Sequence, residues 1–313
     1  MGKGMRGVVL LLAAAALAGC GKAPPQAEAT VQEDPAFNTQ QQQWRMQRHA
    51  ELTAADGWTT LVGLHWLEHK AHYIGHGPGS GIRLAVGPEK LGLLSRQGDR
   101  WWFTPESGAA VSVDGVALRG RVAFDSDRDP QPTRIEFDDG KGQLSLIARG
   151  TRFALRVKHA DAPTRRDFAG IDYWPGGSAW RVHARFLPHP AGRTLPIVDI
   201  TGLTTHMPNA GVVEFERDGQ PYRLQAIAEP GKPLFLIFAD RTSGHGSYPA
   251  GRYLDTDAPT ADGHVWVDFN RAYNPPCAFT PFATCPLAPP ENRLDLRVEA
   301  GERAYHAPEE NAG

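Results

Sequence analysis

The sequence predicts a mainly β protein, built as an antiparallel β-sandwich or as two packed β subdomains, with one short N-terminal helix. The chain of 313 residues holds 34 Gly and 26 Pro, more turn formers than a helical bundle tolerates. Short runs of β-branched and aromatic residues alternate with Gly and Asp turn signals through most of its length. The 41% hydrophobic content supplies a sizeable core, and the formal net charge of -2 offers no basic surface for nucleic acid.

Residues 1–19 are predicted to be an export signal, because Lys3 and Arg6 precede an apolar run that is too short to span a bilayer. The run ends in Leu17-Ala18-Gly19-Cys20, which resembles the lipobox of bacterial lipoproteins. The resemblance implies cleavage before Cys20 and attachment of diacylglycerol to its thiol, with palmitate among the acyl chains. The membrane would then be a partner through these acyl chains. The alternative is an unlipidated signal peptide with a chance cysteine.

Residues 20–43 comprise the lipidated cysteine and an expected flexible tether, which is polar, contains proline and has few large apolar residues. Gly21 replaces the Asp that often marks inner-membrane retention, so we expect the outer membrane, on its periplasmic side. A short helix is predicted from Trp44 to Leu52, where good helix formers precede the breaker Ala55-Asp56-Gly57. The β-rich domain is expected to cover residues 44–305, followed by a disordered tail over 306–313.

Many short strands are predicted along this domain, with hairpin turns at Asp114-Gly115, Asp138-Asp139-Gly140 and Asp218-Gly219. The run 234–238 is apolar on both faces and should be an interior strand. The segment 188–193 could separate two sandwiched sheets or two β subdomains. In chain order the expected strands cover residues 58–64, 82–86, 101–103, 111–113, 116–118, 122–124, 134–137, 144–148, 153–157, 180–186, 197–200, 211–215, 222–226, 234–238 and 265–269.

Two cysteines remain once Cys20 carries lipid, and Cys277 and Cys285 are eight positions apart in an exported chain. A disulfide is the first interpretation, because oxidation is the default in that compartment. The alternatives are two reduced thiols or metal ligation, although two thiolates alone make an incomplete zinc site.

Two other motifs suggest chemistry but have simpler explanations. His65, His69, His72 and His76 would align on one face of a helix, yet the glycines among them favour a strand-turn-strand with chance surface histidines, and no metal is expected. The run Thr242–Ser247 holds hydroxyls and an imidazole beside Asp240, but a Gly- and Ser-rich turn explains it better than a catalytic triad. Since nucleotide and dinucleotide fingerprints are absent from the sequence, no cofactor is expected.

The most informative segment is the proline-rich loop after the predicted strand 265–269. Its prolines exclude a helix or a central strand, and its aromatic residues argue against disorder. A structureless loop of this length is usually functional, although a rigid plug over the end of a sheet is equally compatible with the sequence.

Here the chain resembles an uncharacterised bacterial family, domain of unknown function 1684. The resemblance is carried by DFNRAYNPPCAFTPFATCPLAPPENRL (268–294), by motifs within 238–254, and by Gly57-Trp58 and Gly63-Leu64-His65-Trp66-Leu67, so it extends over nearly the whole mature chain. It implies a shared architecture and no particular mechanism.

Two functional hypotheses follow. In the first, the turn 240–252 and the loop 268–293 form a small-ligand or catalytic site, with hydrolysis as the least demanding reaction. Arg252 would anchor an anion and Asp268 or Glu291 would act as general base. The catalytic candidates are Asp268, Glu291 and Ser243, and the ligand-binding candidates are Asp240, Tyr248, Arg252, Asn270, Tyr273 and Asn274.

In the second hypothesis, the protein is a non-enzymatic structural or interaction lipoprotein of the cell envelope. The loop 268–293 would then be a folding staple or a docking surface. A cavity lined by the polar candidates favours the first hypothesis, whereas polar groups bonded to backbone favour the second.

Overall fold

The computed structural model describes residues 1–2 and 34–307. Residues 3–19 of the predicted export signal, Cys20, the predicted tether up to residue 33 and residues 308–313 of the predicted tail lie outside the described residues. From residue 34 to 307 the chain belongs to one compact unit. In the ranges that the structure describes, no helix is both long and apolar enough to cross a membrane.

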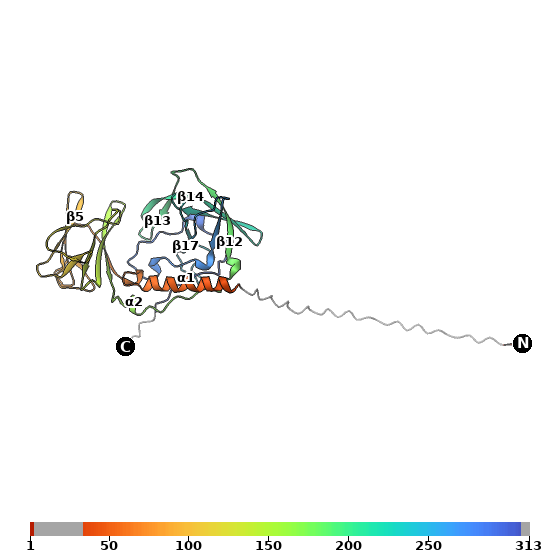
Figure 1. Cartoon of the computed structure of the whole chain (residues 1–313), viewed down its shortest axis with the longest axis horizontal. Helices are drawn as coiled ribbons and strands as arrows, with labels where there is room; N and C mark the ends of the chain where they lie inside the picture. The colour runs from red at the N-terminus through yellow and green to blue at the C-terminus, as the bar shows by residue number, and fades with distance from the viewer. Residues whose placement is uncertain (3–33, 308–313) are drawn as a thin grey trace. The chain divides into compact units, whose positions relative to one another are not determined.

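Helix α1 (Pro35–Thr53) is longer than predicted and starts nine residues before Trp44. Its beginning is set by Asp34, whose carboxylate accepts a hydrogen bond of 2.9 Å from the amide of Ala36, and by Pro35 in the first turn. Residues 35–43 are therefore helical, and this part of the predicted tether was wrong. Figure 1 shows α1 running beneath the C-terminal sheet.

The N-terminal β part is a sandwich of two sheets, with strand orders β1-β11-β10-β9-β6-β7 and β3-β2-β4-β5-β8. Ile74, Leu94 and Phe103 of one sheet share a core with Leu144 and Leu155 of the other. The strands are β1 (Leu61–Trp66), β2 (Ala71–Gly75), β3 (Ile82–Arg83), β4 (Gly92–Gln97), β5 (Arg100–Pro105), β6 (Val111–Val113), β7 (Val116–Ala117), β8 (Val122–Ala123), β9 (Arg134–Phe137), β10 (Gly142–Arg149) and β11 (Arg152–His159).

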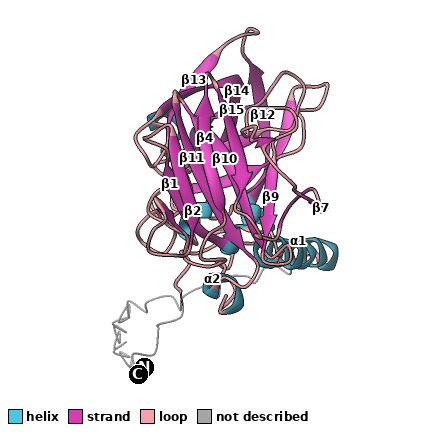
Figure 2. Ribbon diagram, turned by 90° about the vertical axis from the view of Figure 1, so that its left-hand side faces the viewer, coloured by secondary structure: helices cyan, strands magenta, loops and turns pink. Residues whose placement is uncertain are grey.

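The C-terminal β part is a seven-stranded sheet of order β17-β16-β15-β14-β12-β18, with β13 paired to β14. Figure 2 shows strands of both parts in one view. The strands are β12 (Arg181–Pro188), β13 (Thr194–Val198), β14 (Thr204–Arg217), β15 (Gln220–Ile227), β16 (Phe235–Phe238), β17 (Arg252–Asp255) and β18 (His264–Asp268). Helix α2 (Pro163–Arg166) and the 3-10 turn η2 (Ser178–Trp180) connect the two parts, and η3 (Phe269–Arg271), η4 (Pro276–Ala278) and η5 (Pro290–Asn292) follow β18.

The fold class predicted from the sequence is confirmed: the chain is mainly β, its sheets are antiparallel apart from the short pair β2–β3, and a helix precedes them. The Asp-Gly hairpins are also confirmed, since Asp114 and Gly115 (φ 50° and 76°) and Asp218 and Gly219 (φ 53° and 72°) adopt the positive φ of such turns. The possible subdivision at 188–193 is not found, because these residues join β12 to β13 within a single sheet.

Strand β16 shows why its run is apolar on both faces. Leu236 and Phe238 lie in the main core of the C-terminal sheet, while Ile237 packs on the other face in a second cluster with Ala283 and Cys285 of the proline-rich loop. The loop therefore packs on one face of the sheet, whereas the plug interpretation placed it over the end of a sheet.

His65 lies on β1, His69 on the connection, His72 on β2 and His76 directly after β2, which confirms the strand-turn-strand. His72 Nε2 contacts the carbonyl of His69 at 3.0 Å, and His76 Nδ1 contacts the carbonyl of Leu84 at 3.0 Å. Burial lowers the pKa of His65 and of His72. Among the described residues, no group of three metal-ligating side chains is placed to hold an ion.

Candidate functional site

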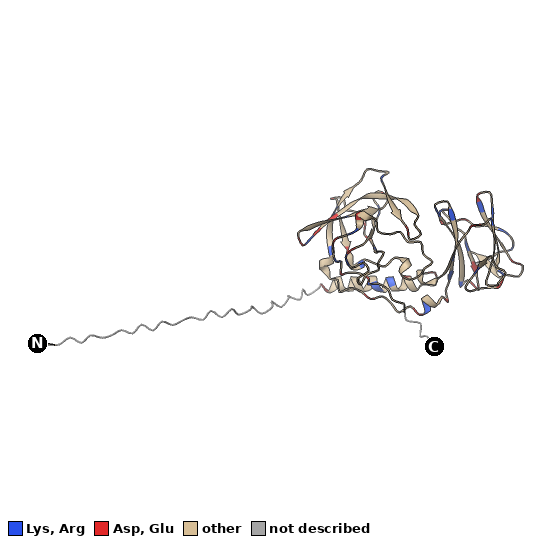
Figure 3. Ribbon diagram, turned by 180° about the vertical axis from the view of Figure 1, so that it is seen from behind, with Lys and Arg blue, Asp and Glu red and all other residues tan. Residues whose placement is uncertain are grey.

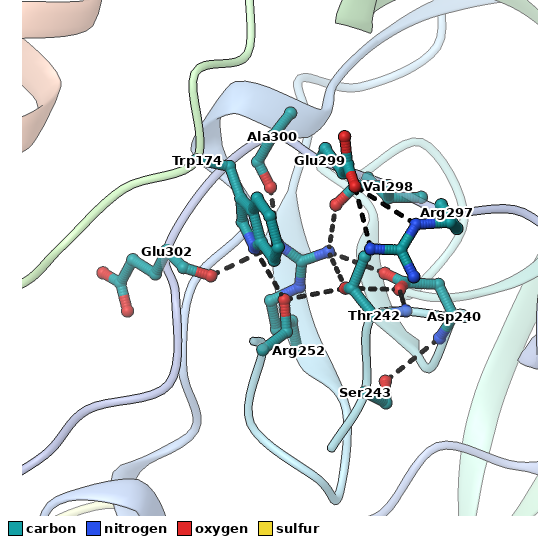
Figure 4. Close-up of polar contacts among 11 residues, drawn as sticks. Trp174, Asp240, Thr242, Ser243, Arg252, Arg297, Val298, Glu299, Ala300 and Glu302 are labelled. Atoms are coloured by element: carbon teal, nitrogen blue, oxygen red, sulfur yellow. Dashed lines mark hydrogen bonds and ion pairs between the residues drawn. The ribbon is translucent and has the colours of Figure 1, made fainter. Parts of the chain in front are cut away.

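The turn 240–252 is organised around a buried ion pair between Arg252, at the start of β17, and Asp240. The Nη2 of Arg252 lies 2.6 Å from Asp240 Oδ2, and the two side chains are 1% and 0% exposed. Figure 4 shows that the same guanidinium also donates to backbone carbonyls of the C-terminal segment, Val298 at 2.9 Å and Ala300 at 2.5 Å. Arg252 therefore ties the turn to that segment.

This geometry corrects the expected role of Arg252 as an anion anchor. A guanidinium whose donors are already used, and which is shielded from solvent, has nothing to offer a ligand. Desolvation lowers the pKa of Arg252, and the Asp240 carboxylate opposes that effect. Asp240 is likewise committed, because its second oxygen accepts hydrogen bonds of 2.5 Å from the amide and the hydroxyl of Thr242.

A chain of hydroxyls extends this network. Thr242 Oγ1 and Ser247 Oγ are 2.8 Å apart, and Trp174 Nε1 donates to Ser247 at 2.9 Å. Ser247 is thus fixed between a hydroxyl and an indole, as a buried structural serine.

Ser243 has no partner that could activate it. Its Oγ accepts a hydrogen bond of 3.1 Å from the amide of Asp240, which closes the turn, and no imidazole or carboxylate of the described residues is hydrogen-bonded to it. A nucleophilic serine needs an adjacent base. The catalytic role expected for Ser243 is therefore unsupported by its surroundings.

Asp268 and Asn270 hold the start of the proline-rich loop. Asp268 caps η3 through the amide of Asn270 (3.1 Å) and accepts a bond of 2.7 Å from Gln41 of α1. Asn270 pairs with both backbone groups of Gly177, at 2.9 Å each. Both side chains therefore join distant segments, and the general base expected at Asp268 is instead a docking point for α1.

Asn274 and Tyr273 continue this pattern. The amide of Asn274 donates to Glu302 Oε2 at 2.6 Å, and its side-chain Nδ2 donates to the carbonyl of Arg303 at 2.7 Å. Tyr273 donates to Asp255 Oδ2 at 2.7 Å, and its backbone pairs with Tyr253. Burial, and secondarily the Asp255 charge, raise the pKa of Tyr273.

Glu302 is a buried carboxylate that the sequence did not single out. Its side chain is 0% exposed and lies 2.9 Å from Arg48 Nε of α1, whose Nη2 also donates to the carbonyl of Asn274 at 3.0 Å. Desolvation raises the pKa of Glu302, and Arg48 opposes the shift. No local sequence pattern identifies this pair, because its members are 254 positions apart.

At the far end of the loop, Asn292 is a structural residue and Glu291 is not. Asn292 accepts from the amide of Gln225 (2.6 Å) and donates to the carbonyls of Gln225 (3.0 Å) and Ile237 (2.8 Å), so it bridges β15 and β16. Glu291 is exposed, and its side chain makes no hydrogen bond or ion pair to a described residue, which leaves its predicted role as a base without support.

The two cysteines are unpaired thiols, so the disulfide prediction was wrong. Cys285 is buried, and its sulfur accepts a hydrogen bond of 3.1 Å from the backbone amide of Cys277 instead of a covalent bond from its thiol. A hydrogen bond with Cys285 lowers the pKa of Cys277, while the same contact and burial raise that of Cys285. The hydroxyl of Tyr248 donates to the carbonyl of Cys277 at 3.2 Å, and burial raises the pKa of Tyr248 to about 12.

The turn and the loop line a cavity of about 370 Å³ that is open to solvent, but only two of the predicted residues, Asp240 and Ser243, line it. Asp240 is its one carboxylate and is neutralised by Arg252. Two arginines, Arg241 and Arg293, supply the other charges of the lining. The remaining lining residues are Ala239, Pro249, Ala250, Leu287, Ala288 and Leu294.

Comparison with known proteins supports the family resemblance found in the sequence, but only over part of the chain. Residues 166–303 match the model of a family described as protein of unknown function (DUF1684), which supports assigning these residues to that family. The motifs at 57–58 and 63–67 lie outside the matched residues, so the similarity that is shown is narrower than the nearly complete coverage expected from the sequence.

A solved structure is also similar in sequence, an uncharacterised protein of Haloarcula marismortui determined by solution NMR. It is 32% identical over 45% of this chain and 80% of that chain, with a TM-score of 0.38. No curated protein matches the chain.

Proposed function

We propose that this protein is a lipid-anchored protein of the cell envelope whose C-terminal part binds a small anionic ligand without transforming it. The observation that supports the binding role is the cavity between the turn 240–252 and the proline-rich loop, whose one carboxylate is already paired.

The charges of this cavity favour an anion. Arg293 is exposed, and its side chain makes no hydrogen bond or ion pair to a described residue. Arg241 is paired with Asp295, at the surface. An arginine with free donors binds carboxylate or phosphate in a bidentate manner. The hydroxyl of Ser243 adds a further polar group, while Leu287 and Leu294 offer an apolar wall.

Binding without catalysis is proposed because the expected catalytic groups are committed elsewhere. Asp268 is bonded to Gln41 and Asn270, and Ser243 closes its own turn. Neither Asp268 nor Glu291 lines the cavity. In this proposal the proline-rich loop mainly stabilises the fold, and a few of its residues also line the ligand site.

A thermal-shift screen of residues 21–313 against acetate, succinate, citrate, phosphate and sugar phosphates tests the proposal. A ligand at one hundred times its Kd stabilises the fold by about 2.7 kcal/mol. Arg293→Ala should weaken a hit about tenfold or more, since it removes a charge-assisted hydrogen bond. Arg134→Ala, at an exposed arginine on β9, is the matched control. If no compound raises the melting temperature, or if Arg293→Ala binds a hit as tightly as the wild-type chain, there is no anion site in this cavity.

The lipid anchor is proposed from the leader sequence, which lies outside the described residues. Expression of the full chain in a bacterium and fractionation of its membranes test it, with Cys20→Ala as the comparison. The wild-type chain should sediment with the outer membrane and the variant should not, because the acyl chains supply the attachment. Equal membrane association of both proteins would contradict lipidation at Cys20.

A further inference from the structure

A second cavity, of about 460 Å³, lies at one end of the C-terminal sheet, apart from the turn and the loop described above. Its walls come from the connections after β12, β15 and β17, together with residues 208–210 of β14. This volume falls within the range of small-molecule pockets. The segment 188–193, which the sequence offered as a possible point of subdivision, forms one wall.

The walls of this cavity are largely apolar and rich in proline. Pro188, Pro190, Pro208, Pro230 and Pro259 all line it. Proline fixes its own φ, so the backbone of the lining has less conformational freedom at these five positions. Two lining residues connect the cavity with the main core of the C-terminal sheet. Leu234 belongs to that core and Phe186 packs against it, so apolar core surface is accessible from the cavity.

The lining also contains two polar side chains, Asn209 and His189, which both contact the side chain of Gln225 beside the cavity. The side-chain amides of Asn209 and Gln225 are hydrogen-bonded at 2.9 Å, and His189 Nε2 lies 3.2 Å from Gln225 Oε1. Asn209 is 5% exposed, and Gln225 is held through its backbone by Asn292. A few convergent polar groups in an apolar wall are typical of a ligand pocket.

Cations predominate among the charged residues of the lining. Arg193 and Lys232 are exposed, and neither side chain makes a hydrogen bond or ion pair to a described residue, while Glu229 is the one acid of the lining. We infer that this cavity binds a small amphipathic anion, a molecule with an apolar body and one carboxylate or sulfonate group. The apolar body would lie against the proline walls, and the anion would meet Arg193 and Lys232.

The test uses residues 21–313, which contain the whole of the described compact unit, and the fluorescent anion 1-anilinonaphthalene-8-sulfonate. Saturable binding is expected, with displacement by octanoate. Ala210→Phe and Ala228→Phe each place a ring in the cavity and should weaken binding about tenfold or more, because the ring takes the volume of the apolar body. Ala117→Phe, at an exposed alanine of β7, should leave binding unchanged.

A charge test assigns the ligand class. The double variant Arg193→Glu and Lys232→Glu should weaken octanoate binding about tenfold or more, and should leave octan-1-ol binding within about twofold, because the alcohol carries no charge. Far-ultraviolet circular dichroism and the melting temperature establish that each variant is folded.

Three results would overturn the inference. One is the absence of saturable binding by the folded wild-type chain at millimolar octanoate. Another is binding that persists in both filled variants while they remain folded. The third is loss of octanoate binding in Arg293→Ala, which would place the ligand in the other cavity. Because Arg293 does not line this cavity, failure here leaves the proposed site at the turn and the loop untouched.

Discussion

Arg252 and Asp240 form an ion pair of 2.6 Å in which both side chains are almost wholly withdrawn from solvent. The residues are twelve positions apart, on a turn and on the strand that follows it. The pair also positions the carbonyls of Val298 and Ala300, which accept from the same guanidinium. From the sequence, both residues were candidates for ligand binding. In the folded protein their ion pair is instead part of the buried core.

Replacing Arg252 by alanine should destabilise the protein by about 3–5 kcal/mol, because the Asp240 carboxylate is left buried without its counter-charge. Urea unfolding of residues 21–313, followed by tryptophan fluorescence, measures the change. Arg252→Lys should recover only part of the loss, since one ammonium group cannot reproduce the planar fork that reaches Asp240, Val298 and Ala300 together. A cost below about 1 kcal/mol, typical of an exposed pair, would contradict the buried role.

Asn292 and Glu291 are neighbours with opposite expected effects. Asn292→Ala leaves the amide of Gln225 and the carbonyls of Gln225 and Ile237 without their partner, so we expect a loss of at least about 2 kcal/mol. Glu291→Ala should change stability by less than about 0.5 kcal/mol, because the side chain is exposed. Equal melting temperatures for the two variants would refute the assignment of Asn292 as the bridge between β15 and β16.

The stability of the protein should carry a pH-dependent contribution from Glu302. Burial raises the pKa of this carboxyl in the folded chain, so the folded state retains a proton that the unfolded state has lost. The contribution is fully present below the ordinary glutamate pKa of about 4.3, and is lost as the pH rises through the raised folded value.

Glu302→Gln isolates this contribution from that of other titrating groups. The unfolding free energy of the wild-type chain minus that of the variant should fall between pH 4 and pH 8, as measured by urea unfolding across that range. Glu51→Gln, at an exposed glutamate of α1, controls for the loss of one carboxyl group. A difference that grows with pH would mean that Arg48 outweighs burial.

The two thiols should react with iodoacetamide at different rates. Cys277 is half-buried and a hydrogen bond with Cys285 lowers its pKa, so it should be alkylated first. Cys285 is 3% exposed and its pKa is raised, so it should be protected in the native protein. Peptide mass spectrometry after brief labelling measures both sites. An intact mass lower by two hydrogens after purification without reductant would show that a disulfide forms instead.

The strands could largely be predicted because their information is local. Alternating residues and Asp-Gly turns located most of them, from the hairpin at Asp114 to the two-faced strand β16. The strands β4 and β17 were not expected. In β17, Arg252 is a charged residue at a buried position, which a hydrophobic pattern does not identify.

The roles of the polar residues could not be predicted, because their partners are remote. Gln41 and Asp268 are 227 positions apart, and Arg48 and Glu302 are 254 apart. Whether a buried carboxylate is a base or a staple depends on which donors reach it after folding. The cysteines were equally difficult to assign from the sequence, because their spacing is compatible with a disulfide. In the folded loop, the backbone amide of Cys277 donates to the sulfur of Cys285 and the two thiols are not bonded to each other.

The sequence by itself determined the fold class, the hairpin turns, the helix before the sheets and the apolar character of β16, because each depends on neighbouring side chains and backbone preferences. Only the tertiary structure decided that Asp240, Arg252, Asp268, Asn270 and Asn274 hold the fold together, and where cavities remain. The physical reason is that hydrogen bonds, burial and cavity walls are formed by segments that meet only when the chain has folded.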